Sequence, residues 1–337
     1  MTHYLLRRLL AMPFLLLGVV TMAFLLGNFV KGDPLASLLT DRQMDNPMVV
    51  AAVKARWGLD KPIPQRYAIY IRNLAQGDLG VSFRTKRPVL RDLLDRLPAT
   101  LELVLCAMTF GSLVGTALGV AAAHWRNRLA DHGARLVALI GSSVPVFWSG
   151  LIALYVFSVQ FSWLPGPGRL DPALRPPETV TGFYTIDALI AGDWVIFQNA
   201  LAHLVLPSVM LGWAVLGIIS RMVRATMLDV MQEDYIITAK AKGAGTLRVL
   251  LRHALRNAMV PALTIIGFSF AYLITGAILT ETVFSWPGVG SYAVDAARSL
   301  DHPAIIGVTI VGALAFLLAN LLTDIAYVFA NPRIRLE

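Results

Sequence analysis

Polar and apolar positions divide this 337-residue chain into six long apolar runs joined by polar segments. None of the runs contains Asp, Glu, Lys or Arg; they are Leu9–Val30, Leu103–Ala123, Leu136–Gly168, Trp194–Ser220, Asn257–Thr280 and Pro303–Thr323. A helix needs about 20 mainly apolar residues to cross a bilayer, and an open strand in lipid would leave its backbone unsatisfied. The pattern therefore predicts an all-α integral membrane protein with six transmembrane helices. Pro165 and Pro167 place the end of the third helix near Phe161.

Arg7 and Arg8 precede the first run, as positive residues precede the core of a secretory signal. The run is longer than the usual core of about 7–15 residues, and no small-x-small cleavage pattern stands before Lys31. We therefore expect the first run to be retained as a membrane-spanning helix.

Composition agrees with a membrane protein, since 56% of the residues are hydrophobic, 15% are charged and the mean hydropathy is +0.64. A soluble domain is nearer a quarter charged. Lys and Arg concentrate in the segments that are cytoplasmic if both termini are cytoplasmic, and the short outside segments are poor in them. The net charge of +8 therefore reflects topology and does not indicate nucleic-acid binding.

The predicted organisation has four parts: an N-terminal tail and first span (1–30), a sizeable periplasmic segment with short helices (31–98), a five-helix core (99–330) that includes a cytoplasmic segment (221–257), and a cytoplasmic tail (331–337). In the periplasmic segment, Pro88–Leu97 has apolar residues at helical spacing. That pattern suits a helix in the membrane interface and equally suits packing within the outside part.

Motifs for catalysis or metal binding are missing from the sequence. It contains no G-x-x-x-x-G-K-[ST] phosphate-binding loop, no Gly-x-Ser-x-Gly nucleophile motif and no cluster of Cys and His. We therefore expect neither a catalytic site nor a cofactor or metal in this chain. Cys106 is the single cysteine, which excludes an internal disulfide.

A polar, basic segment lies between the fourth and fifth runs. Glu233 and Asp234 open a predicted helix, where the helix dipole favours acids, and Gly243 closes it as a C-terminal cap. Ile236, Ala239 and Gly243 share one face, and the two small residues would let another surface approach closely. On these grounds alone, a docking helix and an ordinary surface helix are equally compatible with the segment.

Residues 238–243 (TAKAKG), followed by 253–258 (HALRNA), resemble the EAA coupling motif of ABC-importer permeases in its oligopeptide and dipeptide form. Ile237 and Thr238 depart from the general motif, which has Glu and Ala there. Further similarity to the B-type dipeptide permease subunit runs along nearly the whole chain, including Gly32–Pro34, Gly58–Pro62, Gly77–Gly80, Ala99–Leu103, Leu279–Gly290 and Asn331–Arg335.

The resemblance implies a channel-forming subunit of the bacterial inner membrane that imports dipeptides or short peptides and is not itself an enzyme. It would pair with a second, homologous permease and receive peptide from a periplasmic binding protein. Two cytoplasmic ATP-binding subunits would hold ATP and Mg²⁺. The resemblance assigns the coupling to these subunits to Glu233, Asp234, Tyr235, Ala239, Lys240 and Gly243.

Two further groups of residues are candidate sites. The first group follows the fifth run and consists of Glu281, Phe284, Trp286 and Pro287. These residues could form an outer gate or contact the binding protein, or their aromatic rings could anchor the protein at the lipid headgroups. The second group consists of Glu102, Asn320 and Asp324. These residues could line the translocation path, but packing near helix ends is the favoured interpretation.

Two alternative functions stay open. The same architecture serves importers of nickel, glutathione or haem. An ATPase-independent secondary transporter would carry midspan ionisable residues or broken helices, and the nearly charge-free middles of these runs disfavour it.

Overall fold

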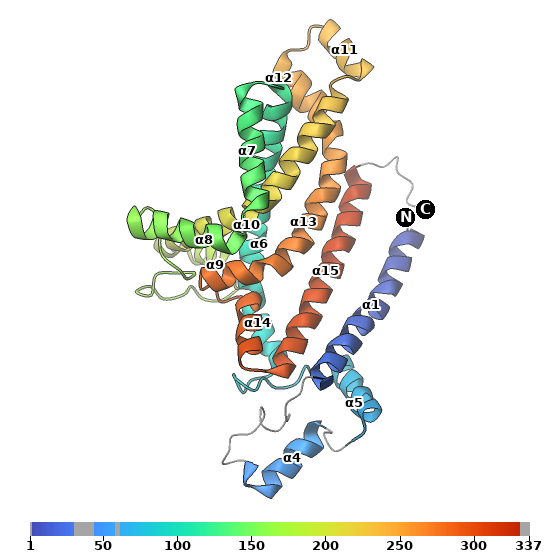
Figure 1. Ribbon diagram of the computed structural model, residues 1–337, viewed down its shortest axis with the longest axis vertical. Helices are drawn as coiled ribbons and strands as arrows, with labels where there is room; N and C mark the ends of the chain where they lie inside the picture. Colours follow the sequence, from blue (N-terminus) through green and yellow to red (C-terminus); the bar gives the residue numbers. More distant parts are fainter. Residues whose placement is uncertain (1, 30–43, 58–60, 331–337) are drawn as a thin grey trace. The chain divides into compact units, whose positions relative to one another are not determined.

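The computed structural model describes residues 2–29, 44–57 and 61–330. The predicted turn at 32–34, most of the 58–62 pattern and the tail 331–337 lie outside the described residues. Within the described residues every regular element is a helix (Figure 1), and one isolated antiparallel bridge joins Val81 to Pro88.

The elements follow one another along the chain as α1 (Thr2–Phe29), α4 (Pro47–Trp57), α5 (Ile63–Ala75), α6 (Val89–His124), α7 (Leu129–Ser143), α8 (Val146–Ala153), the π-helical η1 (Leu154–Gln160), α9 (Tyr184–Ala191), α10 (Trp194–Val230), α11 (Asp234–Ala241), α12 (Thr246–Arg248), the π-helical η2 (Val249–Ala254), α13 (Leu255–Val283), α14 (Val289–Arg298) and α15 (His302–Ala330).

Five helices in the described part of the chain are long and apolar enough to cross a membrane, and a sharply bent pair is a sixth candidate. They are Arg7–Leu25, Val89–His124, Trp194–Val230, Thr246–Ile274, His302–Ile325 and the pair formed by Leu129–Ser143 with Val146–Gln160. The all-α membrane architecture is therefore confirmed. The side of the membrane on which the termini and residues 31–98 lie stays a prediction.

The predicted third span is not one straight helix. It bends by 107° between α7 and α8, and Val144 at the bend has an extended backbone with φ −85° and ψ 130°. Pro145 explains the bend, because proline has no N–H to donate and disfavours helical geometry in the residue before it. The sequence interpretation placed proline breaks only at the end of this run and was wrong about its interior.

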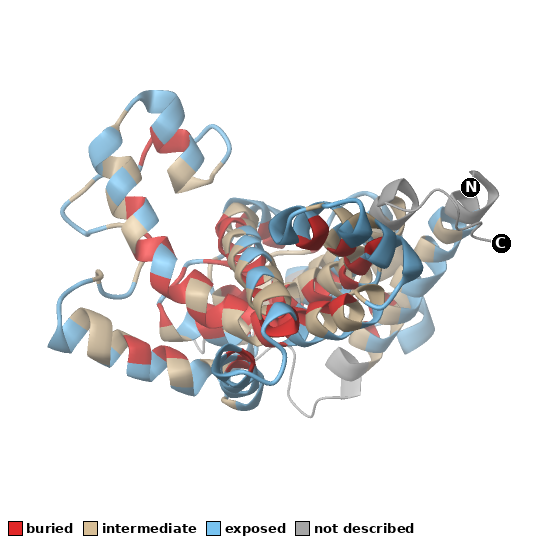
Figure 2. Cartoon of the chain, turned by 90° about the horizontal axis from the view of Figure 1, so that it is seen from above, coloured by how far each residue is buried: buried red, intermediate tan, exposed pale blue. Residues whose placement is uncertain are grey.

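The chain divides into two compact units, one formed by residues 1–4, 98–291 and 315–337 and the other by residues 5–97 and 292–314. In the first unit, α6, α10 and α13 supply a core that includes Leu103, Leu211, Val215, Ile219 and Leu273. The helices carry buried residues along one side and exposed residues along another (Figure 2), as expected for helices whose outer sides face lipid or a partner.

Glycines bring α6 close to α10 within the first unit. A Cβ atom at Gly111, Gly115 or Gly119 would lie 2.8, 2.9 or 2.8 Å from a backbone oxygen of α10. Membrane helices gain little from hydrophobic burial against one another, so close backbone approach at small residues spaced by four is a major source of their association.

The second unit contains the start of α6, where the Pro88–Leu97 pattern was predicted to be helical. Val89 and Leu93 are fully buried, whereas Leu90 and Leu94 are exposed. In the same unit Tyr292 donates a hydrogen bond to Asp92 at 3.2 Å, and burial raises the pKa of Tyr292 to about 12. One face of this helical turn is therefore packed within its unit, and the other is free to contact the membrane interface.

Candidate functional site

The segment predicted to couple to a partner forms the short helix α11 (Figure 1). Gly243 has φ +81°, the left-handed conformation that glycine adopts without a Cβ clash. The N–H of Ala244 donates to the carbonyl of Ala239 at 3.1 Å, and that of Gly243 donates to Lys240 at 2.9 Å. This pair of hydrogen bonds is the Schellman ending of a helix, so the predicted helix and its glycine cap are confirmed.

The face of α11 predicted to dock is partly turned inward. Ile236 is fully buried and belongs to the core that also contains Val249 and Leu250. Ala239 is half-buried, and Gly243 is exposed. The other proposed coupling residues, Glu233, Asp234, Tyr235 and Lys240, are all exposed.

Apolar side chains that the sequence interpretation overlooked are exposed on and after α11. Ile237 is 56% exposed, and Leu247 of α12 and Leu251 of η2 are 70% and 50% exposed. Tyr235 accepts a hydrogen bond from Asn257 at 2.6 Å, which ties α11 to the start of α13. Because α12, η2 and α13 follow without a break, a displacement in this region can reach a membrane-spanning helix directly.

A buried ion pair joins Glu102 of α6 to Arg169, which lies in the loop between η1 and α9. Their side chains are 3% and 7% exposed, and the Nη2–Oε2 distance is 2.5 Å. The second oxygen of Glu102 accepts from the N–H of Thr185 at 2.9 Å and from its hydroxyl at 2.7 Å. Both charges are thus compensated, as buried charges must be.

Aromatic rings enclose the guanidinium of Arg169. Its central carbon lies 3.7 Å from the centre of the Tyr184 ring and 5.4 Å from that of Trp286, distances at which a cation is attracted to a ring face. Trp286 donates its indole N–H to the carbonyl of Ala99 at 2.8 Å. One buried polar centre therefore joins three segments: the loop that carries Arg169, residues 99–102 of α6, and the turn after α13.

Glu281 is the second carboxylate of the buried polar centre and is fully buried. It accepts from the hydroxyl of Thr100 at 2.6 Å and from the N–H of Ser291 at 2.8 Å. Thr100 in turn accepts from the N–H of Val289 at 2.8 Å. A Cβ at Gly288 would lie 2.4 Å from both Glu281 and Thr100, so glycine is required there.

The four residues predicted to form an outer gate or contact therefore differ in solvent exposure. Phe284 and Trp286 are buried with Glu281, and Pro287 is exposed. A gate, a binding-protein contact and a headgroup anchor all call for accessible side chains, which only Pro287 offers in this conformation. The gate and contact roles stay predictions.

Asp187 of α9 holds the loop that carries Arg169. It accepts from the N–H and hydroxyl of Thr181, at 2.8 and 2.7 Å, and from the N–H of Gly182 at 2.9 Å. Burial works to raise the pKa of Asp187, but these hydrogen bonds outweigh burial and lower the pKa below its usual value. The ionised carboxylate thus shapes the loop, and Gly182 passes the constraint to Arg169 by accepting its hydrogen bond at 3.0 Å.

The remaining candidate path residues lie on α15. Asn320 and Asp324, one helical turn apart, are half-buried, and the side-chain oxygen of Asn320 has no hydrogen-bond partner among the described residues. Glu102, by contrast, is fully paired. The structure thus pairs Glu102 within the protein, and the path or packing roles of Glu102, Asn320 and Asp324 stay predictions.

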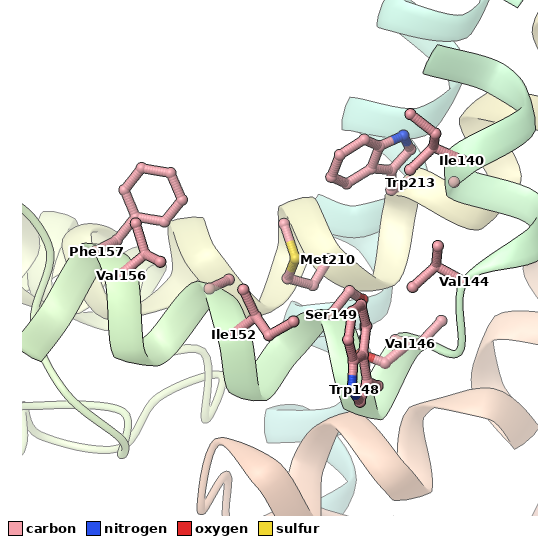
Figure 3. Close-up of a pocket in the computed structure, with 12 residues that line it drawn as sticks. Ile140, Val144, Val146, Trp148, Ser149, Ile152, Val156, Phe157, Met210 and Trp213 are labelled. Atoms are coloured by element: carbon pink, nitrogen blue, oxygen red, sulfur yellow. Dashed lines mark hydrogen bonds between the residues drawn. The ribbon is translucent and has the colours of Figure 1, made fainter. Parts of the chain in front are cut away.

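The bend between α7 and α8 forms an open apolar pocket of about 350 Å³ against α10 (Figure 3). Trp213 and Ile140 lie at one side, Trp148 and Val146 at another, and Met210 between them. The lining is mostly apolar, and Ser149 is the one residue in it with a hydroxyl group.

Family comparison gives this arrangement its context. The model described as "Binding-protein-dependent transport system inner membrane component" matches residues 115–336, and the N-terminal model of the same transport system component matches residues 1–104. The chain belongs to this family. It is thus an inner-membrane permease, in agreement with its membrane-spanning helices.

Curated relatives of the permease are similar over nearly its whole length. The di/tripeptide transport system permease protein of Pseudomonas aeruginosa is 45% identical, with 94% of each chain covered. The probable D,D-dipeptide transport system permease protein of Escherichia coli K12 is 43% identical, covering 94% of this chain and 93% of the relative. The dipeptide transport system permease protein of Escherichia coli K12 is 42% identical, with 99% of each chain covered.

Sequence reasoning missed Arg169, Thr100 and Thr185 in the permease, although it named Glu102 and Glu281. A signal was available for Arg169. A carboxylate at the start of an apolar span needs a cation, and the segment between the third and fourth runs contains only two arginines, Arg169 and Arg175.

Proposed function

We propose that this permease and a second, homologous permease together form the channel of an ATP-driven importer. The importer moves dipeptides or short peptides from the periplasm to the cytoplasm. The observation that carries this proposal is the similarity to peptide permeases along nearly the full chain. In the proposed orientation both termini and α11 are cytoplasmic, and residues 31–98 are periplasmic.

Two cytoplasmic ATP-binding subunits supply the energy, with ATP and Mg²⁺ bound to them, and a periplasmic binding protein delivers the peptide. α11 docks into a cleft of one ATPase subunit. Exposed Tyr235, Ile237 and Lys240 supply the docking surface, because Ile236 is committed to the core of the permease itself. The unbroken course of α12, η2 and α13 supports transmission of ATPase closure to the channel.

A bulk substitution at Gly243 tests the docking. A Cβ at this position meets no atom within 4 Å, so a larger side chain projects away from the permease. Gly243→Trp should insert normally but reduce ATP-driven dipeptide uptake in proteoliposomes to background, because the added ring keeps the ATPase surface away. Gly243→Asn is the matched control, since asparagine tolerates left-handed backbone better than most residues, and it should retain most of the uptake. Normal uptake by stably inserted Gly243→Trp would refute the docking role.

Uptake assays decide the cargo and the energy source. The complete complex should accumulate di- and tripeptides in preference to nickel, glutathione or haem. Preference for one of those three solutes would replace the peptide assignment. Accumulation without the ATPase subunits would instead identify a secondary transporter, a class in which broken helices such as α7–α8 are common.

A further inference from the structure

We propose that Arg221 of α10 faces the water-filled passage of the permease and holds the C-terminal carboxylate of a peptide in transit. This inference rests on the proposed function. Arg221 lies within the candidate span Trp194–Val230, where an ionisable side chain is expensive and usually faces a cavity or a partner.

Arg221 directly follows the apolar run Trp194–Ser220, and its guanidinium points back along that run. Its Nη1 donates to the hydroxyl of Ser142 at 2.9 Å. Ser142 stands at the far end of the 15-residue helix α7, about 20 Å from its first residue at a rise of 1.5 Å per residue. Near the start of α7, Asp131 pairs with Arg224 of α10, so the two helices run antiparallel. Side chains tilt toward the N-terminus of their helix, and Arg221 therefore extends away from the α11 end of α10.

The charged residues nearest to Arg221 along α7 and α10 pair with one another. Arg224 makes two hydrogen bonds to Asp131, each 2.8 Å long, and Arg135 lies 3.3 Å from the same carboxylate. Among the described residues, the neutral hydroxyl of Ser142 is the one hydrogen-bond partner of Arg221. Both Arg221 and Ser142 are exposed. An exposed cation that points along an apolar run, with a neutral hydroxyl as its described partner, calls for water and an anion, because contact between a charge and lipid is costly.

A carboxylate is the anion that this group fits. Nη1 is engaged by Ser142, whereas the edge formed by Nε and Nη2 makes no hydrogen bond to the described residues. That edge can grip a carboxylate with two parallel hydrogen bonds. Every unmodified peptide carries one carboxylate at its C-terminus, whatever its side chains, so the contact would serve many sequences. A carboxylate of the second permease and an anionic lipid are the competing sources.

The test is ATP-driven dipeptide uptake, expressed per ATP hydrolysed, by the complete complex in proteoliposomes. Loss of the passage contact should lower uptake while ATP hydrolysis stimulated by loaded binding protein persists. We expect the ratio to fall about threefold in Arg221→Lys, tenfold in Arg221→Gln and further in Arg221→Glu, which repels the carboxylate. The matched control is Arg128→Gln, which removes the same charge from the exposed residue before α7 and should leave the ratio unchanged.

Three results would overturn the proposal. An unchanged ratio in Arg221→Gln would show that the residue does not act on the peptide. A loss that disappears in vesicles of purely zwitterionic lipid would identify a lipid headgroup as the ligand. A parallel loss of uptake, hydrolysis and association with the second permease would identify a partner carboxylate. Failure of the unaltered complex to accumulate dipeptide on ATP would instead refute the proposed function.

Discussion

The buried polar centre around Arg169 and the helix α11 hold their polar residues in contrasting ways. In the centre, Glu102 and Glu281 are almost completely buried and each accepts hydrogen bonds from several donors. On α11, Asp234 and Lys240 are exposed at the helix ends that suit their charges. The centre fixes three segments to one another, whereas α11 contributes a single deeply buried side chain, Ile236.

The difference shows where stability and function are separable in this permease. A buried ion pair gains little over apolar packing when it is intact, but breaking it is costly because one charge stays behind without a partner. Exposed residues on a short helix affect folding only slightly. Mutations in the buried centre should therefore act first on folding, and mutations on the outer face of α11 first on transport.

Removing Arg169 should have the largest effect on stability. Arg169→Ala leaves Glu102 buried without its cation and should destabilise the protein by about 3–5 kcal/mol, measured by thermal unfolding of the purified permease. Arg175→Ala is the matched control, because Arg175 lies in the same loop and is exposed, and it should change stability by less than about 0.5 kcal/mol. Equal effects of the two substitutions would show that the ion pair does not hold the loop.

Removing the hydroxyl of Thr100 should have an intermediate effect. Thr100→Val keeps the shape of the side chain but takes a donor from Glu281 and an acceptor from the N–H of Val289. A buried polar group left unsatisfied costs about 1–3 kcal/mol. Thr109→Val is the control, because the hydroxyl of Thr109 bonds only a carbonyl of its own helix at an exposed position. A Thr100 variant as stable as the Thr109 variant would contradict the role given to this bridge.

Local signals explain why α11 could be predicted from the sequence and the polar centre could not. The acids at 233–234 and Gly243 are helix-boundary signals that act within one or two turns. Glu102 and Arg169 stand 67 positions apart, and their meeting depends on the packing of α6 with α9 and α10. The bend at Pro145 was visible as a proline within an apolar run, but hydropathy alone does not distinguish a straight span from a broken one.

The inward turn of Ile236 shows a further limit of pattern reading. Helical spacing correctly placed Ile236, Ala239 and Gly243 on one face. It could not decide whether that face meets a partner or the protein itself, because both are apolar surroundings. The structure buries Ile236 in the core of the first unit, and the exposed apolar residue next to it, Ile237, becomes the stronger candidate for docking.

The neighbouring isoleucines provide the smallest expected change in stability and the sharpest contrast between folding and function. Ile237 is 56% exposed, so Ile237→Ser should change the free energy of unfolding by less than about 0.5 kcal/mol. The same variant should lose most ATP-driven uptake, because it removes an apolar contact from the proposed docking surface. Ile236→Ala is the matched comparison, and it should destabilise the permease by about 2–5 kcal/mol because it empties a filled core position. If Ile237→Ser transports normally, the outward side chains of α11 do not carry the coupling, and docking must use the exposed cap around Gly243 instead.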